Sequence, residues 1–392
     1  MHSVRFITLG CRLNQAEEAV FAGAFAARGW RIVFDDAPAD AVVLHSCAVT
    51  RQAERATLQT LRALKHGAKP PFVAVAGCAT AALPEMVLEE AGADLVVQVR
   101  DPQVLCDLLC RLVESNAIPS SPQAAPCLFP GKPNDPDNNA LPVPAPAPLP
   151  REPAPEPLFR HPEKALLKIQ DGCDFRCAYC IVPFTRGPSV SFPFDNLVAA
   201  AQRMADRGAR EIVLTGCNLA CYHDGGHDLA DLAAKVCNAV AGQGAVVSLG
   251  SVEPAICDRR IIDAMLAHAN FKRFVHLPIQ SGDSRVLALA RRKYTGEGIR
   301  NVLSLYRESV PRLVLGADFI TGLPGEDETA FKKTEGLVRD FAFDLVHVFP
   351  YSPRRGTAAL NLPERPSRSV AKERAARLRT VANQANATSP RA

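Results

Sequence analysis

The distribution of proline marks the clearest domain boundary in this chain. Fourteen of its 32 prolines lie between Pro119 and Pro157. A run so rich in proline forms neither helix nor sheet and favours an extended, semi-rigid backbone. We therefore expect residues 117–160 to be a linker, although a proline-rich ligand for another protein's aromatic groove is an alternative. At 392 residues the chain is long enough for two or three domains.

Residues 1–116 alternate short apolar segments with helical ones. We predict strands at residues 4–9, 41–44, 72–76 and 94–98, with helices at 15–28 and 51–65. Strand–helix alternation of this kind predicts a parallel sheet with helices on its faces, which is an α/β domain.

A cysteine follows each of the first three predicted strands. The three are Cys11, Cys47 and Cys78, and two of them stand directly after a glycine. Because parallel strands end at one edge of a sheet, where ligands of open α/β sheets bind, we expect these thiols to lie together. The alternative is chance, since cysteine is commonly buried. The pattern favours a cluster held by three protein ligands.

After the linker the strand–helix alternation resumes. We predict six strands, at residues 165–169, 211–214, 246–249, 273–277, 313–319 and 345–349, with helices between them. Six units predict a partial (β/α)6 barrel, because the closed eight-unit barrel needs about 250 residues. We expect this domain to cover residues 161–360, and residues 361–392 to form a basic, helical tail.

Three further cysteines follow the first strand of the second domain, at the spacing C-x3-C-x2-C. They are Cys173, Cys177 and Cys180, with Tyr179 just before the last. Four thiolates complete a tetrahedral zinc site or an iron–sulfur cube. Three at this spacing hold three corners, so a cube bound here keeps one iron open for a chelating ligand. The alternatives are half of a zinc site and a coincidental run of small buried residues. Since this loop already provides three ligands, we interpret Cys217 and Cys221 as buried or pocket-facing.

Polar or glycine-rich turns follow the later strands of the second domain. Those singled out are Thr215, Gly216, Ser251, Glu253 and Gln280. Because the strand ends of such barrels carry the chemistry, we expect these residues to line a ligand pocket. A lone histidine such as His276 is interpreted as a core residue rather than a ligand or a base.

Composition narrows the class of protein. A hydrophobic content of 47% and a charged content of 22% are those of a soluble globular protein. The net charge of +4 permits a nucleic-acid partner without requiring one. No apolar run approaches 18 residues, so we expect no membrane span. The N-terminus passes directly into a strand pattern rather than a secretory signal. We expect a cytoplasmic protein, in which thirteen cysteines indicate metal or redox chemistry rather than disulfides.

One basic run is a candidate for contact with nucleic acid. It consists of Arg291, Arg292, Lys293 and Tyr294, and its aromatic ring could stack on a base. A solvated surface is the alternative interpretation, because runs of lysine and arginine usually mark one.

Together these segments resemble the methylthiotransferase family of radical S-adenosylmethionine enzymes. The segments that carry the resemblance are residues 8–17, 172–189, 276–282, 318–326 and 348–353. Residues 12–15 (Arg-Leu-Asn-Gln) and residues 186–189 (Arg-Gly-Pro-Ser) are most similar to the branch that modifies threonylcarbamoyladenosine in tRNA.

The resemblance implies an enzyme with two [4Fe–4S] clusters. Cys173, Cys177 and Cys180 would bind the cluster that cleaves S-adenosylmethionine to a 5′-deoxyadenosyl radical. An auxiliary cluster that carries or supplies sulfur would be bound by Cys11, Cys47 and Cys78. The radical would attack C2 of the adenine at position 37 of tRNA, and a second S-adenosylmethionine would provide the methyl group. Contacts to S-adenosylmethionine would come from Tyr179, Thr215, Gly216, Ser251, Glu253 and Gln280.

The implied partners are tRNAs that read ANN codons and a reductant such as flavodoxin or ferredoxin. Alternative substrates are isopentenyladenosine in tRNA and a ribosomal protein. A catalytically weak iron–sulfur protein that binds RNA is a further alternative. Members of the family usually end in a small RNA-binding β-barrel, which we expect to be absent here, because no run of alternating strands follows residue 361.

Overall fold

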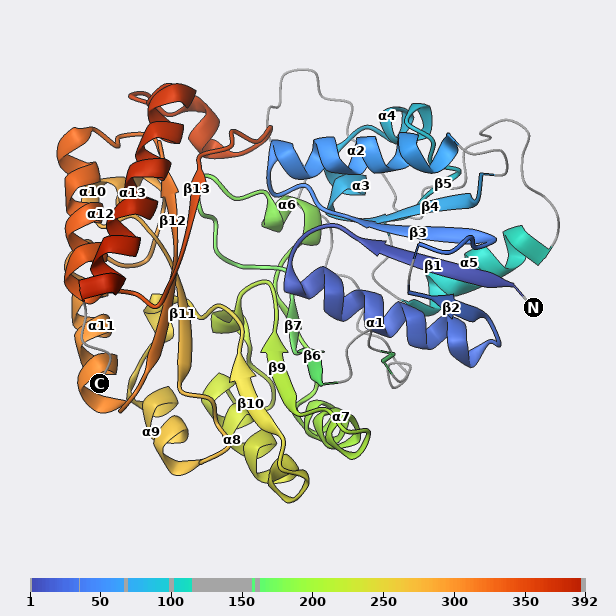
Figure 1. The fold of residues 1–392 in the computed structure, drawn as a ribbon, viewed down its shortest axis with the longest axis horizontal. Helices are drawn as coiled ribbons and strands as arrows, with labels where there is room; N and C mark the ends of the chain where they lie inside the picture. Colours follow the sequence, from blue (N-terminus) through green and yellow to red (C-terminus); the bar gives the residue numbers. More distant parts are fainter. Residues whose placement is uncertain are drawn as a thin grey trace. The chain divides into compact units, whose positions relative to one another are not determined.

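The computed structural model describes residues 2–34, 36–66, 70–98, 102–114, 157–158 and 163–388 (Figure 1). The chain divides into two compact units. The first comprises Met1–Pro162 with Ile181–Pro188, and the second comprises Glu163–Cys180 with Ser189–Ala392. The short segment after the cysteine loop therefore belongs to the first unit. The predicted linker lies outside the described residues except for residues 157 and 158.

The first unit is built on a five-stranded sheet in the order β2-β1-β3-β4-β5, and all its neighbouring strands are parallel. The strands are β1 (Ser3–Thr8), β2 (Arg31–Val33), β3 (Ala41–Ser46), β4 (Phe72–Gly77) and β5 (Leu95–Val96). Every residue of the central strand β3 is buried, as expected for a parallel strand covered on both faces. The edge strand β2 was not predicted, because three residues are too short to show a period.

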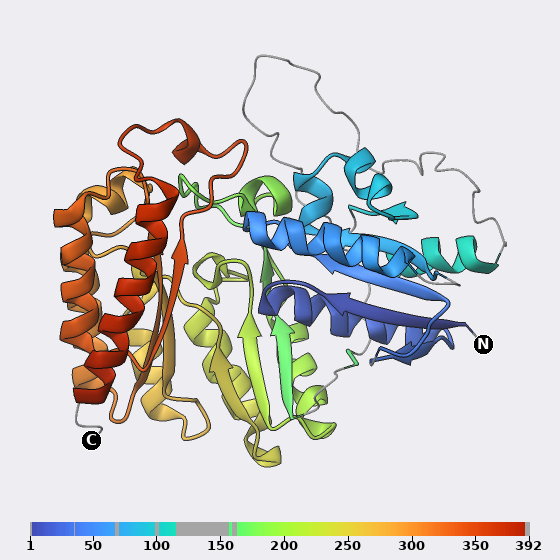
Figure 2. The same cartoon turned by 45° about the horizontal axis from the view of Figure 1, so that its top comes forward.

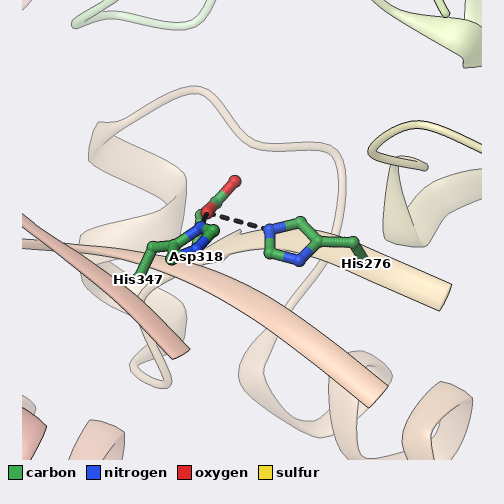
Figure 3. Close-up of side chains that lie close together, drawn as sticks. All are labelled: His276, Asp318 and His347. Atoms are coloured by element: carbon green, nitrogen blue, oxygen red, sulfur yellow. Dashed lines mark hydrogen bonds and ion pairs between the residues drawn. The ribbon is translucent and has the colours of Figure 1, made fainter. Parts of the chain in front are cut away.

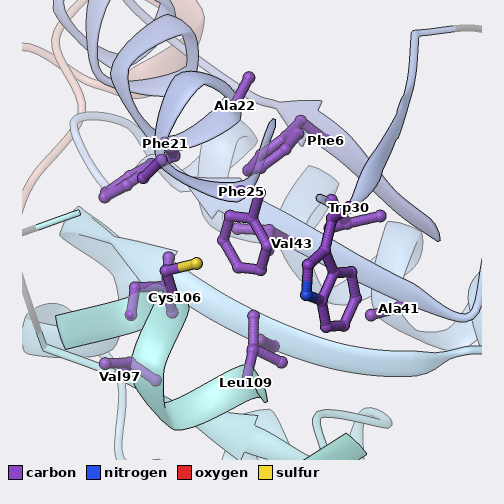
Figure 4. Packing of buried hydrophobic residues seen from close by; sticks show 14 of the residues in the cluster. Phe6, Phe21, Ala22, Phe25, Trp30, Ala41, Val43, Val97, Cys106 and Leu109 are labelled. Atoms are coloured by element: carbon purple, nitrogen blue, oxygen red, sulfur yellow. The ribbon is translucent and has the colours of Figure 1, made fainter. Parts of the chain in front are cut away.

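Two apolar cores lie on the two faces of this sheet. The helices are α1 (Arg12–Ala27), α2 (Arg51–Lys65), α3 (Cys78–Ala82), α4 (Glu85–Glu90), α5 (Pro102–Glu114) and α6 (Val182–Arg186). One core joins α1 and α5 to the sheet around Phe6, Phe25 and Trp30, whose rings pack edge to face (Figure 4). The other core contains Leu61 of α2 and Leu88 of α4. The α/β prediction for this part is confirmed.

The second unit contains two parallel three-stranded sheets, in the orders β10-β9-β6 and β11-β12-β13. The strands are β6 (Lys164–Lys168), β9 (Glu211–Thr215), β10 (Val246–Leu249), β11 (Phe274–Gln280), β12 (Val314–Thr321) and β13 (Leu345–Pro350). Parallel bridges from Val247 to Phe271 and from Ser251 to His276 join the two sheets. The resulting wall of six parallel strands confirms the predicted partial (β/α)6 barrel. A short antiparallel pair, β7 (Gln170–Asp171) and β8 (Val190–Ser191), was not predicted.

The helices of the second unit flank this wall (Figures 1 and 2). They are α7 (Phe194–Asp206), α8 (Leu229–Val240), α9 (Arg259–Ala267), α10 (Ser284–Leu289), α11 (Gly296–Ser309), α12 (Glu328–Phe341) and α13 (Arg368–Thr388). Side chains of Asp228, Asp283 and Asp327 accept hydrogen bonds from backbone N–H groups and so fix where three of them begin.

Helix α13 packs beside α12 and strands β12 and β13. Two of its arginines pair with acidic side chains: Arg374 Nη1 lies 2.9 Å from Glu326 Oε1, and Arg377 Nε lies 2.7 Å from Glu335 Oε1. These charges are therefore engaged within the second unit. None of the helices in the described ranges is long and apolar enough to cross a membrane.

Candidate functional site

The first unit brings three cysteines to one edge of its sheet. Cys11 precedes α1, Cys47 follows β3, and Cys78 is the first residue of α3 after β4. Because β1, β3 and β4 are parallel and in register, the turns after them lie side by side. Burial, with a smaller contribution from the nearby thiols of Cys78 and Cys11, raises the pKa of Cys47 to about 11. The sulfur atoms are thus close enough to interact electrostatically, as the strand pattern predicted.

Two glycines let the backbone approach this edge. Gly10 has φ +125°, and a Cβ atom on it would lie 2.7 Å from Cβ and 3.0 Å from Sγ of Cys47. Gly77 has φ +94°, and its Cβ would lie 2.5 Å from the carbonyl oxygen of Ser46. An L side chain at either position meets both a strained backbone and an occupied volume. Both glycines are therefore required by the geometry around the cysteines.

A buried arginine contacts this triad from α6, within the same unit. Arg186 Nε lies 3.3 Å from Cys78 Sγ. Its Nη1 and Nη2 donate to the two carboxylate oxygens of Glu17 at 2.8 and 2.9 Å, and Nη2 also donates to Asn14 Oδ1 at 3.0 Å. His45 Nε2 lies 3.1 Å from Glu17 Oε2. Burial raises the pKa of Cys11, and the charge of Arg186 opposes this rise. Arg186 is itself paired with Glu17, so the network places a neutralised cation beside the triad.

Sequence reasoning used Arg186 only as part of a family motif and missed this contact. The available signal was the pair Asn14 and Glu17, which are polar residues in the first turns of a helix that follows Cys11. Both are buried, and a buried carboxylate and amide require polar partners. The partner comes from a segment about 170 residues away in sequence, which no local pattern reveals.

The three thiols form a donor set that suits an iron–sulfur cube, which is bound through cysteine thiolates. A zinc ion with a fourth ligand would use the same kind of donors. The thiols of Cys78 and Cys11 both contribute to the raised pKa of Cys47, so all three residues lie near one another.

The second unit presents the compact cysteine loop after β7. Cys173 and Cys177 are buried, and Cys180 is half-buried. Asn218 Nδ2 lies 3.5 Å from Cys173 Sγ, and the amide of Ser189 donates to Asp174 Oδ1 at 2.8 Å, which ties the loop to the segment that follows it. The loop is thus held by its neighbours in the same unit before any group is bound.

A fourth thiol lies beside this loop. Cys221, in the turn after β9, shares a hydrogen bond with Cys173, and this bond lowers the pKa of Cys221 to about 7. The same bond raises the pKa of Cys173. Cys217 Sγ lies 3.3 Å from Asp171 Oδ1. The interpretation of Cys221 as buried or pocket-facing therefore omitted its direct contact with the loop.

Arg292 is the counterpart of Arg186 in the second unit. Its side chain is 3% exposed, and its Nη1 lies 3.1 Å from Cys177 Sγ and 3.2 Å from the hydroxyl of Tyr179. Its Nη2 lies 2.5 Å from Glu253 Oε2. Burial raises the pKa of Glu253, while the charge of Arg292 lowers it. The arginine thus links the cysteine loop to the turn after β10.

The predicted RNA contact needs correction at two of its four residues. Arg292 points into the second unit, and Tyr294 donates from its hydroxyl to the carbonyl oxygen of Pro278 at 2.9 Å. Neither side chain is free to meet a base, because both are held among buried polar groups. Arg291 and Lys293 are exposed, and Lys293 Nζ lies 4.2 Å from the ring centre of Phe175.

The other predicted cofactor contacts lie at strand ends around the cysteine loop. Thr215 ends β9 and is buried, and a Cβ on Gly216 would lie 2.9 Å from Gln170 Oε1. Ser251 is exposed after β10, next to the turn that carries Glu253. Gln280 ends β11 with φ +72° and is buried. The strand-end residues therefore include both buried groups and an exposed hydroxyl.

Comparisons with known proteins agree with this geometry. Residues 167–338 match the family model described as the radical SAM superfamily, and residues 3–98 match the model described as uncharacterized protein family UPF0004. The chain is 31% identical to threonylcarbamoyladenosine tRNA methylthiotransferase MtaB of Treponema pallidum, over 97% of this chain and 87% of that protein. The chain belongs to the radical S-adenosylmethionine tRNA methylthiotransferase family. This family uses S-adenosylmethionine and carries two [4Fe–4S] clusters.

A second relative belongs to another branch of the family. The chain is 30% identical to tRNA-2-methylthio-N(6)-dimethylallyladenosine synthase of Coxiella burnetii, over 96% of this chain and 82% of that protein. Among solved structures, the fold is similar to that of the radical S-adenosylmethionine methyltransferase TsrM from Kitasatospora setae. The TM-score is 0.61 at 14% identity, covering 92% of this chain and 77% of that one.

Proposed function

We propose that this chain methylthiolates C2 of N6-threonylcarbamoyladenosine at position 37 of tRNAs that read ANN codons, in the cytoplasm. The observation that carries the proposal is the presence of two separate cysteine triads, one in each unit. A single triad suffices to generate a radical, whereas the insertion of sulfur needs a second group that holds it. Flavodoxin or ferredoxin is the proposed source of electrons.

Cys173, Cys177 and Cys180 are the proposed ligands of the cluster that works with S-adenosylmethionine. When bound there, this cluster supplies the electron that splits S-adenosylmethionine into methionine and a 5′-deoxyadenosyl radical. The protein's own contribution is positional. Arg292 holds Cys177 and the hydroxyl of Tyr179 in place and keeps Glu253 neutralised. The strand-end residues Thr215, Gly216, Ser251, Glu253 and Gln280 are the proposed contacts to S-adenosylmethionine.

Cys11, Cys47 and Cys78 are the proposed ligands of the sulfur-bearing cluster. Arg186 contacts Cys78 and is itself neutralised by Glu17, so a cation lies beside the triad without leaving an unpaired buried charge. Gly10 and Gly77 leave room around the sulfur atoms. These residues orient and stabilise the bound group, while the group provides the sulfur.

Two observations bear on the choice of nucleoside. The residues 12–15 and 186–189 resemble the threonylcarbamoyladenosine branch, and a relative of that name is 31% identical to the chain. A relative that acts on dimethylallyladenosine is 30% identical. That nucleoside is therefore the second candidate, and the experiment must separate the two.

The test is mass spectrometry of tRNA nucleosides from a strain that lacks this gene, with the gene restored as a control. We expect 2-methylthio-threonylcarbamoyladenosine to disappear and to return on complementation. If the 2-methylthio derivative of dimethylallyladenosine (isopentenyladenosine) disappears instead, the second candidate is favoured. If neither nucleoside changes, and the genome encodes no second enzyme for either, the proposed function is wrong.

A further inference from the structure

Three side chains on neighbouring strands of the second unit converge on one another (Figure 3). They are His276 on β11, Asp318 on β12 and His347 on β13. His276 Nε2 lies 2.9 Å from Asp318 Oδ1, and His347 Nδ1 lies 3.0 Å from the same oxygen. Their ligand atoms all lie within 4.8 Å of one another.

The register of the sheet brings these residues together. Asp318 pairs with His347 across β12 and β13, and His276 pairs with Gly316 across β11 and β12. Because side chains alternate along a strand, Gly316 and Asp318 share one face of β12. His276 and His347 therefore stand on either side of Asp318 on this face.

Gly316 provides the space that His276 occupies. A Cβ atom on Gly316 would lie 2.3 Å from Nδ1 of His276. Any other residue would displace the imidazole from its position beside Asp318. The ring is also flanked by Phe274 and by the ring of His347, with ring centres 6.3 and 5.2 Å away. The histidine is thus held in one orientation by its surroundings.

We propose that His276, Asp318 and His347 bind a divalent first-row transition metal ion, of which zinc is the probe. Two imidazoles and one carboxylate are a ligand set for such metals, with coordination positions left open. Ligand atoms about 2.1 Å from an ion lie roughly 3 Å apart when they are adjacent. The distances of 2.9 and 3.0 Å match that separation.

Distances of 2.9 and 3.0 Å are also those of hydrogen bonds between the imidazoles and the carboxylate, which a bound ion would replace. The ligand atoms of all three residues lie within 4.8 Å of one another, so one ion can contact all three. The group is also accessible from one side, since the side chains of Asp318 and His347 are 22% and 47% exposed, whereas that of His276 is 7% exposed. An ion can therefore enter, and water or a substrate atom can complete its coordination. A hard ion such as Mg²⁺ is disfavoured, because only one oxygen ligand is present.

This site differs from the two cysteine triads in the chemistry of its ligands and in their place along the strands. Its ligands are nitrogen and oxygen, and each lies within a strand rather than in the turn after it. From the sequence alone His276 is interpreted as a core residue, because Asp318 and His347 lie far from it along the chain. The inference does not depend on which substrate the enzyme modifies.

The test measures zinc bound by the full-length protein after anaerobic reconstitution of its clusters. The protein is dialysed against a fixed free concentration of Zn²⁺, and zinc and iron per chain are measured by mass spectrometry. We expect one zinc per chain in the unchanged protein and none in His347→Ala or Asp318→Ala. His268→Ala is the matched control, because His268 is a half-buried histidine of the same unit at the end of α9. It should bind zinc as the unchanged protein does.

X-ray absorption at the zinc edge identifies the ligands. Nitrogen and oxygen ligands at about 2.0–2.1 Å support the proposal, and sulfur ligands at about 2.3 Å mean that zinc has entered a cysteine triad. The proposal is overturned by sulfur ligation, or by zinc binding that is unchanged in both His347→Ala and Asp318→Ala. It is equally overturned if the unchanged protein binds no zinc while its iron content is intact. A parallel dialysis against Mg²⁺ should show no bound magnesium.

Discussion

The two cysteine triads use the same local device but are assembled in different ways. In each, a buried arginine contacts one cysteine sulfur and is neutralised by a buried glutamate: Arg186 with Glu17 in one unit, and Arg292 with Glu253 in the other. The triad of the second unit lies within one loop, whereas that of the first is collected from three strand ends. Loop spacing alone defines one site, and sheet topology defines the other.

The two triads are expected to differ in how well they keep their spacing when their surroundings change. The loop cysteines keep their spacing as long as the loop is held, because they are close in sequence. Cys11, Cys47 and Cys78 keep theirs only while β1, β3 and β4 stay in register and Gly10 and Gly77 allow the close approach. We therefore expect the first-unit triad to be more sensitive to changes in its surroundings.

The largest expected effect separates the roles of the triads. Cys177→Ala should abolish cleavage of S-adenosylmethionine and hence all methylthiolation, because the proposed radical cluster loses a ligand. Cys47→Ala should abolish methylthiolation but retain cleavage to 5′-deoxyadenosine. Both products are measured by chromatography with a chemical reductant. If Cys47→Ala also loses cleavage, its triad supports the structure rather than the transfer of sulfur.

The next effect concerns the buried arginines. Arg186→Met leaves Glu17 as a buried carboxylate without its main partner, which should lower the free energy of unfolding by about 3–5 kcal/mol. Arg292→Met should cost a similar amount through Glu253. The exposed pair Arg259 and Asp263 provides the control, because Arg259→Ala should cost at most about 1 kcal/mol.

These losses in the free energy of unfolding are measured by urea titration, with a spectroscopic probe in each unit. Adding Glu17→Gln to Arg186→Met should recover part of the lost stability, since the unpaired charge is removed. Failure to recover any of it would indicate that packing, rather than charge, explains the loss. Equal effects of Arg186→Met and Arg259→Ala would contradict the buried network.

A smaller effect is expected when one glycine near each triad is replaced by alanine. Gly10→Ala places a methyl group against Cys47 in a left-handed backbone conformation, and should cost roughly 1–3 kcal/mol and reduce iron bound by the first-unit triad. Gly216→Ala would place a Cβ atom 2.9 Å from Oε1 and 3.1 Å from the carbonyl oxygen of Gln170. Gly216 has no positive φ, so the backbone is not strained and the cost should be lower. Iron content and urea unfolding of the two variants test the order. The reverse order would contradict the greater sensitivity of the first triad.

The smallest expected effect concerns Asp283, which lies near Arg292 in the chain. Asp283 caps α10, the helix that precedes Arg292. Burial alone would raise the pKa of Asp283, but hydrogen bonds from Lys333 and the amide of Val286 lower it overall. Because the folded pKa is below the unfolded one, the carboxylate stabilises the fold above about pH 4, and this contribution is lost as the pH falls.

Asp283→Ala should accordingly cost about 1 kcal/mol at pH 7, as for other lost helix caps. The difference from the unchanged protein should narrow as the pH is lowered from about 5 to 3. Urea unfolding at several pH values measures it. A difference that stays constant with pH would assign the effect to the cap geometry rather than to the charge.

The α/β architecture of both units could be predicted from the sequence, but the edge strand β2 and the pair β7–β8 could not. Hydrophobic periodicity predicted the longer strands, and strand ends predicted that Cys11, Cys47 and Cys78 would meet. Contacts between residues that are far apart in the sequence could not be predicted from these patterns. Arg186 pairs with Glu17 because α6 joins the first unit, and Arg292 turns inward although its run of charges is typical of a surface. His276, Asp318 and His347 meet only through the register of three strands.

The measurement that tests the two-triad account most directly is iron and sulfide per chain after anaerobic reconstitution. Two [4Fe–4S] clusters require about eight of each in the unchanged protein. Replacing Cys11, Cys47 and Cys78 by alanine should leave about four, and replacing Cys173, Cys177 and Cys180 should leave about four bound by the first unit. About four irons in the unchanged protein, with no further loss when Cys11, Cys47 and Cys78 are replaced, would contradict the account.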